Sequence, residues 1–287
     1  MNLDKLIDIE NATQSRSIFY DEGIYNLEME KVFGRCWLFL THENQIPRPG
    51  DYVKTTMGED EVIVVRQRDN SIKAFLNACR HRGAQVCSAE VGSARNFSCN
   101  FHGWTYGIDG ALILVPLEKE LYKNKLDKCK LGLREVAKVE NYHGFIFGNF
   151  DAQAPSFRDY LGDMAWYVDS WMDIAGGVEL IGPPSRSFLK CNWKTPSENF
   201  CGDIYHVGWT HGAALKALGA KESRIGNKGL PADGNGMQIT TQCGHGMGVV
   251  FDPGPMILGG DIATDYVAWQ NSIRSQVEEA PMPGRAR

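Results

Sequence analysis

The stretch Cys79–Trp104, CRHRGAQVCSAEVGSARNFSCNFHGW, decides the fold of the chain around it. It carries two short arms, Cys79-x-His81 and Cys99-x-x-His102, and each arm offers one thiolate and one imidazole. Zinc fingers usually present their ligands in like pairs, as two cysteines followed by two histidines. Mixed arms instead suit a centre whose two metal ions take different ligands.

Such a centre is the Rieske [2Fe–2S] cluster, in which two cysteines hold one iron and two histidines hold the other. Two arms that fold face to face deliver this arrangement, with one Cys and one His from each arm. We therefore predict four cluster ligands, Cys79, His81, Cys99 and His102. The alternatives are a zinc site, or two buried cysteines beside unrelated histidines. The coincidence of four ligands with neighbouring glycines favours the cluster.

The composition predicts a sizeable core and a surface that does not attract polyanions. Of the 287 residues, 43% are hydrophobic and 23% are charged, and the net charge is −5. This balance gives no electrostatic reason to expect nucleic acid or an anionic membrane as a partner. No apolar run approaches the ~18 residues that span a bilayer, and the N-terminus does not resemble a secretory signal. We expect a cytoplasmic protein.

The eight cysteines are scattered along the chain, unlike the dense disulfide framework of a small secreted domain. Cys87 lies between the two arms, but it has no histidine or cysteine at a ligand spacing. We therefore interpret Cys87 as a structural residue.

Short β-like runs on both sides of the arms predict an all-β domain with the cluster loops inserted between strands. Asp109-Gly110 is the strongest hairpin signal. We assign residues 36–153 to this Rieske domain and residues 1–35 to an N-terminal arm with a helix over 21–33. The predicted strands are Trp37–Leu40, Tyr52–Thr56, Glu61–Val65, Ile72–Leu76, Trp104–Tyr106, Ala111–Val115, Val136–Glu140 and Gly144–Phe150.

The remainder, residues 154–287, predicts the first part of a second, α+β domain, in which helices pack on an antiparallel sheet. Ser156 begins a helix that extends to Trp171, with Asp159 as its capping-box partner. Two strand-like pieces follow, Val178–Ile181 and Arg186–Lys190. The fold class of the whole chain is therefore α+β.

A second group of candidate ligands lies in residues 192–212, NWKTPSENFCGDIYHVGWTHG. If Ser197 begins a helix, then Asn199, Asp203 and His206 lie on one face. His211 follows five residues later, which on a continuous helix points it about 140° away. Gly208 offers a place for the helix to distort.

Two imidazoles and one carboxylate form the facial triad of non-haem Fe(II) oxygenases. Taken alone, a pair of histidines at this spacing is more often structural or on the surface than metal-binding. A cluster that moves one electron at a time needs an acceptor, and this need favours an iron site.

Together these motifs resemble one known family. C-R-H-R-G-A, C-N-F-H-G-W-T-Y and N-W-K-x-P-x-E-N-F-x-G-D-x-Y-H-x-x-x-T-H are similar to motifs of the large subunit of Rieske non-haem iron aromatic-ring-hydroxylating dioxygenases. The run Gly246–Asp252, GMGVVFD, most resembles the naphthalene and polycyclic-aromatic branch. The resemblance covers roughly residues 15–260.

The resemblance implies that His206 and His211 bind a mononuclear Fe(II). It implies that Asp203 is the carboxylate joining a cluster histidine of one subunit to an iron-ligand histidine of the next. Asn199 then lies near the iron. Two further residues match substrate-pocket positions, Phe200 and Val207, and ordinary helix packing is the equal alternative for both.

The resemblance further implies a terminal oxygenase component that adds O₂ to an aromatic ring to give a cis-dihydrodiol. It implies that electrons come from NAD(P)H through a separate reductase, usually with a ferredoxin, and leaves open whether the reductase delivers them directly. A small beta subunit and an α3 or α3β3 oligomer are expected.

The family's third iron ligand, an aspartate, falls beyond Arg287. We therefore expect a partial sequence that holds the cluster and binds the mononuclear iron weakly or not at all. The alternatives are a Rieske electron-transfer protein or inactive fragment that lacks a complete iron site, and a zinc-stabilised binding module, which would be colourless.

Overall fold

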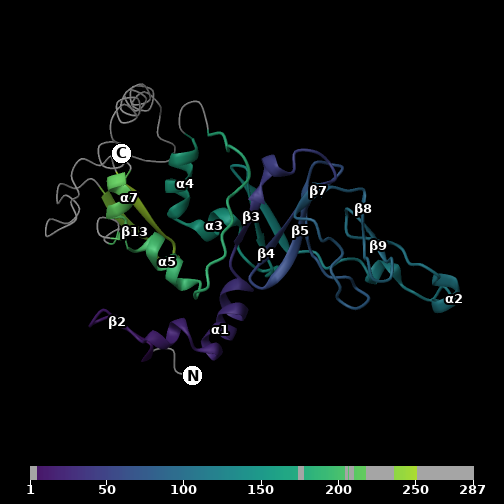
Figure 1. The fold of residues 1–287 in the computed structure, drawn as a ribbon, viewed down its shortest axis with the longest axis horizontal. Helices are drawn as coiled ribbons and strands as arrows, with labels where there is room; N and C mark the ends of the chain where they lie inside the picture. The colour runs from purple at the N-terminus through teal and green to yellow at the C-terminus, as the bar shows by residue number, and fades with distance from the viewer. Residues whose placement is uncertain (1–4, 174–177, 204–205, 207–209, 218–235, 251–287) are drawn as a thin grey trace. The chain divides into compact units, whose positions relative to one another are not determined.

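The computed structural model describes residues 5–173, 178–203, 206, 210–217 and 236–250 (Figure 1). The chain divides into two compact units. The first unit consists of Met1–Tyr160 with Leu180–Ser187, and the second of Leu161–Glu179 with Phe188–Arg287. Of the helices within the described ranges, none has the length and apolar character that crossing a bilayer requires. The domain boundaries after residues 35 and 153 stay predictions.

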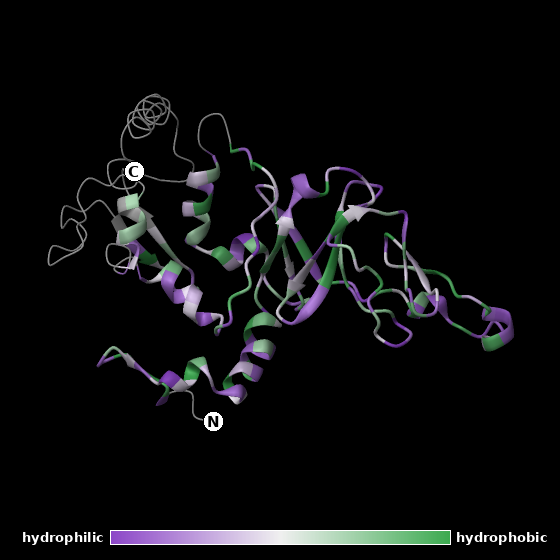
Figure 2. Cartoon of the chain, in the orientation of Figure 1, coloured by the Kyte–Doolittle hydropathy of each residue, from purple (hydrophilic) through white to green (hydrophobic). Residues whose placement is uncertain are grey.

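The first unit begins with a small hairpin and an amphipathic helix. β1 (Ile7–Asp8) pairs with β2 (Thr13–Gln14), and the 3₁₀ turn η2 (Arg16–Phe19) leads to α1 (Glu22–Glu28). Asp21 caps α1 by accepting a hydrogen bond from the Ile24 N–H at 2.9 Å. The π-helical turn η3 (Met29–Phe33) continues α1, which confirms the helix predicted over 21–33. Figure 2 shows hydrophobic and hydrophilic residues alternating along α1.

Three antiparallel sheets follow in the described part of the first unit (Figure 1). The largest has the order β6-β5-β4-β7, with bounds Ile72–Leu76, Asp60–Arg66, Asp51–Met57 and Val91–Ser93. The second has the order β11-β12-β3, with bounds Lys138–Tyr142, Phe145–Asn149 and Leu38–His42. The third has the order β10-β9-β8, with bounds Leu112–Leu114, Thr105–Gly107 and Asn96–Ser98. The connections contain three short helical pieces, η4 (Glu43–Gln45), α2 (Glu118–Tyr122) and η5 (Lys128–Lys130).

All eight strands predicted between residues 36 and 153 are present, with ends that differ by two residues at most. The sequence patterns did not predict β7 and β8, which lie inside the stretch between the two arms. The arms follow β6 and β8, so the prediction that the cluster loops are inserted between strands is confirmed.

The central strand β5 is buried on both faces. All four residues of Val62–Val65 are 0% exposed. Because successive side chains of a strand point to opposite faces, Ile63 and Val65 enter one core and the other two valines enter a second. The first core also contains Cys79 and Cys99. Burial of each Val or Ile side chain stabilises the fold by about 1.5–3 kcal/mol. β5 therefore anchors the core that also contains the cysteines of both arms.

The second unit places helices beside a β-hairpin. The helices described in this unit are α4 (Met164–Met172), α5 (Lys194–Cys201) and α7 (Gly212–Ala217), and β13 (Gly236–Thr240) pairs with β14 (Gly246–Val250). α5 packs against this hairpin, where a Cβ added to Gly246 would lie 3.0 Å from Cys201 Cβ. A sheet-rich first unit and a second unit of helix and sheet confirm the predicted α+β fold class.

The single helix predicted from Ser156 to Trp171 is wrong, because the structure has two helices there. α3 (Phe157–Leu161) ends at Gly162, whose φ of +53° is left-handed, and α4 begins afterwards. The predicted cap is correct: Ser156 Oγ donates to Asp159 Oδ2 at 2.6 Å and accepts from the Asp159 N–H at 3.1 Å.

The strands predicted at Val178–Ile181 and Arg186–Lys190 are also wrong. A strand needs a partner for its backbone groups, and neither piece pairs with a strand among the described residues. Ile181 is 94% exposed, and Gly182 follows it with a left-handed φ of +75°. Their apolar character alone therefore does not produce a strand.

Candidate functional site

The two arms fold into the same hydrogen-bonded turn. The Cys79 carbonyl accepts from the Gly83 N–H at 2.8 Å, and the Cys99 carbonyl accepts from the Gly103 N–H at 2.9 Å. Gly83 has φ +79° and Gly103 has φ +72°, a conformation that glycine adopts without strain. The glycines thus shape both turns, and each turn presents its cysteine and histidine together.

The structure brings the four predicted cluster ligands into one region. Cys79 is 4% exposed and Cys99 is 3% exposed, and both belong to one core. The rings of His81 and His102 lie with centroids 4.6 Å apart at 77°. Two buried thiols and two adjacent imidazoles are the donor set that a Rieske cluster requires.

The Nδ1 atom of His81 gives an independent test of this fit. It is buried and has no hydrogen-bond partner, which is costly for a ring nitrogen unless a metal ion binds there. Desolvation, and after it the charges of His102 and Arg82, lower the pKa of His81. The neutral imidazole, which is the metal-binding form, is therefore favoured. These residues fit a cluster with His81 and His102 on one iron and the two cysteines on the other.

Aromatic side chains cover the two histidines unequally. The buried Trp104 stacks on His81 with centroids 5.0 Å apart and planes at 12°. His102 is exposed, and Phe101, whose ring lies edge-on to it at 4.6 Å, is 70% exposed. The histidine end of the site is therefore accessible to solvent at His102.

Tyr106 is a candidate site residue that the sequence patterns did not single out. It is 0% exposed, and its hydroxyl oxygen lies 3.2 Å from Cys79 Sγ. The same oxygen accepts from the Arg80 N–H at 3.0 Å, so its own proton is free to point at the sulfur. Burial, and after it the bond with Cys79, raise the pKa of Tyr106, which keeps it a neutral donor. Only its position in the C-N-F-H-G-W-T-Y motif hinted at a role.

We expect Tyr106→Phe to lower the reduction potential of the cluster by about 40 mV. A hydrogen bond to a ligand sulfur stabilises the reduced cluster, and a bond of about 1 kcal/mol corresponds to that potential for one electron. A redox titration followed by electron paramagnetic resonance (EPR) measures the change. Tyr52→Phe is the matched control, because the buried Tyr52 hydroxyl bonds to Cys87, which is not a predicted ligand. An equal shift in both variants would contradict the assignment.

The second candidate group lies where α5 ends, and here one prediction is wrong. Ser197 does not begin the helix; α5 begins at Lys194, and Ser197 Oγ bonds to the Trp193 carbonyl at 3.0 Å. α5 stops at Cys201, so Asp203 and His206 lie beyond it and do not share a helical face. The Asp203 side chain accepts from the His206 N–H at 3.1 Å, a local bond that competes with a continuing helix.

Outside a helix, His206 and His211 converge. Their Nε2 atoms lie 3.3 Å apart, and the ring centroids are 5.2 Å apart. Two imidazole nitrogens bound to one metal ion at about 2.0–2.1 Å, with an angle of about 90–110°, lie about 2.9–3.4 Å apart. The distance between the two nitrogens therefore agrees with two ligands of one iron. Asp203 Oδ2 lies 3.4 Å from His206 Nδ1, on the other side of the ring.

The roles of all the predicted site residues stay predictions, and three of these residues lie outside the contacts described so far. Asn199 is half-buried in the last turn of α5, and Phe200 is 76% exposed. Val207 lies outside the described residues. Among the described residues, no three His, Cys, Asp or Glu side chains are grouped to hold one metal ion, so they supply no third ligand to the His206–His211 pair.

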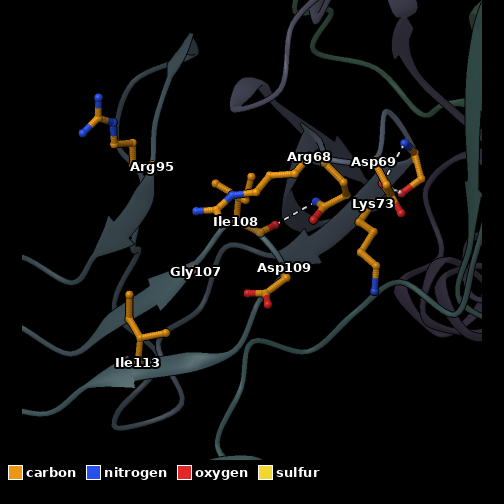
Figure 3. A pocket seen from close by; sticks show the side chains of 10 residues that line it. Arg68, Asp69, Lys73, Arg95, Gly107, Ile108, Asp109 and Ile113 are labelled. Carbon is orange, nitrogen blue, oxygen red and sulfur yellow. Dashed lines mark hydrogen bonds between the residues drawn. The ribbon is translucent and has the colours of Figure 1, made fainter.

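Figure 3 shows a pocket of about 540 Å³ where the β5–β6 turn meets the β9–β10 hairpin. Arg68, Lys73 and Arg95 line it together with Asp69 and Asp109, so its charges are mixed. None of the predicted site residues lines this pocket. It is therefore separate from both candidate sites.

Two family models match the chain. Residues 36–138 match the Rieske [2Fe-2S] domain, and residues 157–278 match the catalytic domain of the ring hydroxylating alpha subunit. The first range contains the four predicted cluster ligands, and the second contains His206 and His211.

Individual relatives agree with both models. The large oxygenase component of the naphthalene 1,2-dioxygenase system of Pseudomonas aeruginosa is 48% identical over 283 residues, which cover 98% of this chain and 63% of the relative. The large oxygenase component of the 2,4-dinitrotoluene dioxygenase system of Burkholderia sp. is 46% identical, covering 100% of this chain and 64% of the relative. A structure of naphthalene 1,2-dioxygenase with indole bound in the active site superposes with a TM-score of 0.88 at 47% identity, covering 96% of this chain and 62% of that chain. The chain thus spans somewhat less than two thirds of the length of the relatives it matches.

Proposed function

Because this chain belongs to the ring-hydroxylating alpha subunits that carry a Rieske [2Fe–2S] domain, we propose that it works in a terminal oxygenase that oxidises an aromatic ring. The carrying observation is that one chain holds both the four-ligand arms and the converging His206–His211 pair. The relatives' names favour a naphthalene-like aromatic substrate, and we propose a cis-dihydrodiol as the product.

When bound, the cluster supplies single electrons and a mononuclear iron supplies O₂ activation. The chain's own part at the first centre is to hold and protect the ligands. Cys79 and Cys99 supply thiolates from the dry core, and His81 and His102 supply imidazoles at its edge. Trp104 excludes water from the face of His81.

At the second centre the chain orients a ligand ring. His206 Nδ1 donates a hydrogen bond to the Asp203 carbonyl, which holds the ring proton on that nitrogen. Nε2 of His206 is then the unprotonated nitrogen that faces His211. We propose that the Asp203 carboxylate, on the same side, also links this ring to a cluster histidine of a neighbouring subunit.

The proposed partners follow from the chemistry. The two proposed centres would pass one electron at a time, so a separate reductase and a ferredoxin would deliver the electrons, in keeping with relatives named as components of systems. The exposed edge formed by Phe101 and His102 is where such a donor could approach. A small beta subunit and an α3 or α3β3 assembly complete the proposal.

A second candidate function is electron transfer alone. It is favoured by one observation: all four proposed cluster ligands lie within the first unit, which therefore holds them without the His206–His211 pair. Under this reading the His206–His211 pair has no role.

Iron and product analysis of the purified protein tests the proposal. We expect visible absorbance, a rhombic EPR signal on reduction, and the two irons of the cluster per chain; a third iron marks a filled His206–His211 site. With reductase, ferredoxin and naphthalene, the complete site is expected to form a dihydrodiol. A colourless zinc protein would contradict the cluster. A coloured protein that holds a third iron but forms no oxidised product would contradict the oxygenase proposal and support electron transfer alone.

A further inference from the structure

Both cluster arms are closed by a backbone hydrogen bond at the cysteine, but the segments that flank the two arms are held together in different ways. The Cys79 N–H donates to the Ala84 carbonyl and the Cys99 N–H donates to the Trp104 carbonyl, each at 2.8 Å. The second arm joins β8 to β9, which are adjacent and antiparallel with Ser98 paired to Thr105, so backbone pairing closes it. The first arm joins β6 to β7, which occupy opposite edges of the β6-β5-β4-β7 sheet. The segments that flank the first arm therefore do not pair with each other as strands, and a side-chain contact holds them together instead.

The side chain of Asn77 makes that contact. Asn77 follows β6, two residues before Cys79, and is 4% exposed. Its Oδ1 accepts from the N–H groups of Val86 and Cys87, both at 3.0 Å. Its Nδ2 donates to the Cys87 carbonyl at 2.8 Å. The Asn77 amide thus joins the segment that leaves β6 to the segment that leads to β7, where the second arm has strand pairing instead.

Asn77 is also fixed to the sheet. Its second Nδ2 hydrogen bonds to Glu61 Oε2 at 3.1 Å, and its backbone N–H donates to the Glu61 carbonyl at 2.8 Å. Glu61 in turn pairs with Lys54 of β4 at 3.4 Å. All four hydrogen-bonding positions of the amide are therefore used, and three of them hold the arm.

We propose that Asn77 is a positioning residue for the cluster: it closes the arm that carries Cys79 and His81 and so holds both ligands in place. The proposal rests on the cluster site of the proposed function. Loss of a residue that hydrogen-bonds to metal ligands and orients them typically lowers metal affinity or activity by about 10–100-fold.

The test compares two buried asparagines. Asn149 is 0% exposed and bonds to the Arg35 carbonyl at 2.9 Å and the Asp151 N–H at 2.8 Å, in the sheet that lacks the arms. We expect Asn77→Leu to lose its visible absorbance at least about tenfold faster under an iron chelator than Asn149→Leu. The reduced Asn77→Leu protein should also show shifted EPR g-values, which a general loss of stability would not produce.

Equal bleaching rates and unchanged g-values in the two variants would overturn the proposal. If Asn77→Leu does not fold, hydrogen–deuterium exchange of the unaltered protein decides the matter. The Val86 and Cys87 amides are then expected to be as protected as those of β5, and exchange at the rate of an open loop would refute the role of Asn77. Absence of a cluster in the unaltered protein would instead refute the proposed function.

Discussion

A chain with Cys99 replaced by alanine is expected to lose the cluster entirely, with no visible absorbance, no rhombic EPR signal and both cluster irons gone. One iron of a Rieske centre is held by two thiolates, and the variant leaves it only Cys79. Cys87, the cysteine that lies between the two arms, is not placed to replace Cys99. Its thiol bonds to the Ala89 carbonyl at 3.4 Å and to Tyr52. Iron and acid-labile sulfide per chain measure the loss.

Cys87→Ala is the control for this prediction. Cys87 is 7% exposed and Cys99 is 3% exposed, so each substitution removes one buried sulfur, at a similar cost of about 1 kcal/mol in stability. We expect Cys87→Ala to keep the cluster. If it bleached like Cys99→Ala, the interpretation of Cys87 as structural would fail, and a different ligand set would be needed.

The first unit could be predicted well because its signals are local. Val62–Val65 is a continuous apolar run, as expected for a strand buried on both faces, and Asp109-Gly110 forms the predicted turn with Gly110 at φ +84°. The mixed ligand arms identify the cluster chemistry by residue type alone. These features need no knowledge of distant parts of the chain.

What could not be predicted depends on contacts between distant residues. Tyr106 reaches Cys79 across 27 positions, and Asn77 closes a loop ten positions long. In the sequence, Tyr106 cannot be distinguished from an ordinary buried tyrosine, and Asn77 cannot be distinguished from an ordinary asparagine in a turn. The end of α5 was missed for a different, local reason: the Asp203 side chain accepts from the His206 N–H three residues later and competes with the next helical turn.

His206→Ala is expected to reduce dihydrodiol formation by at least about 100-fold in the complete oxygenase with its redox partners, while the absorbance of the cluster stays unchanged. Loss of a ligand should cost at least as much as loss of an orienting partner, which is typically about 10–100-fold. His206 Nε2 lies 3.3 Å from that of His211, so its removal leaves one imidazole where the facial triad needs two. His245→Ala is the control, since this histidine lies before β14 and belongs to neither candidate site. Single-turnover product analysis of the reduced protein measures the effect. Normal product from His206→Ala would eliminate the iron-ligand role and leave the cluster as the chain's redox centre.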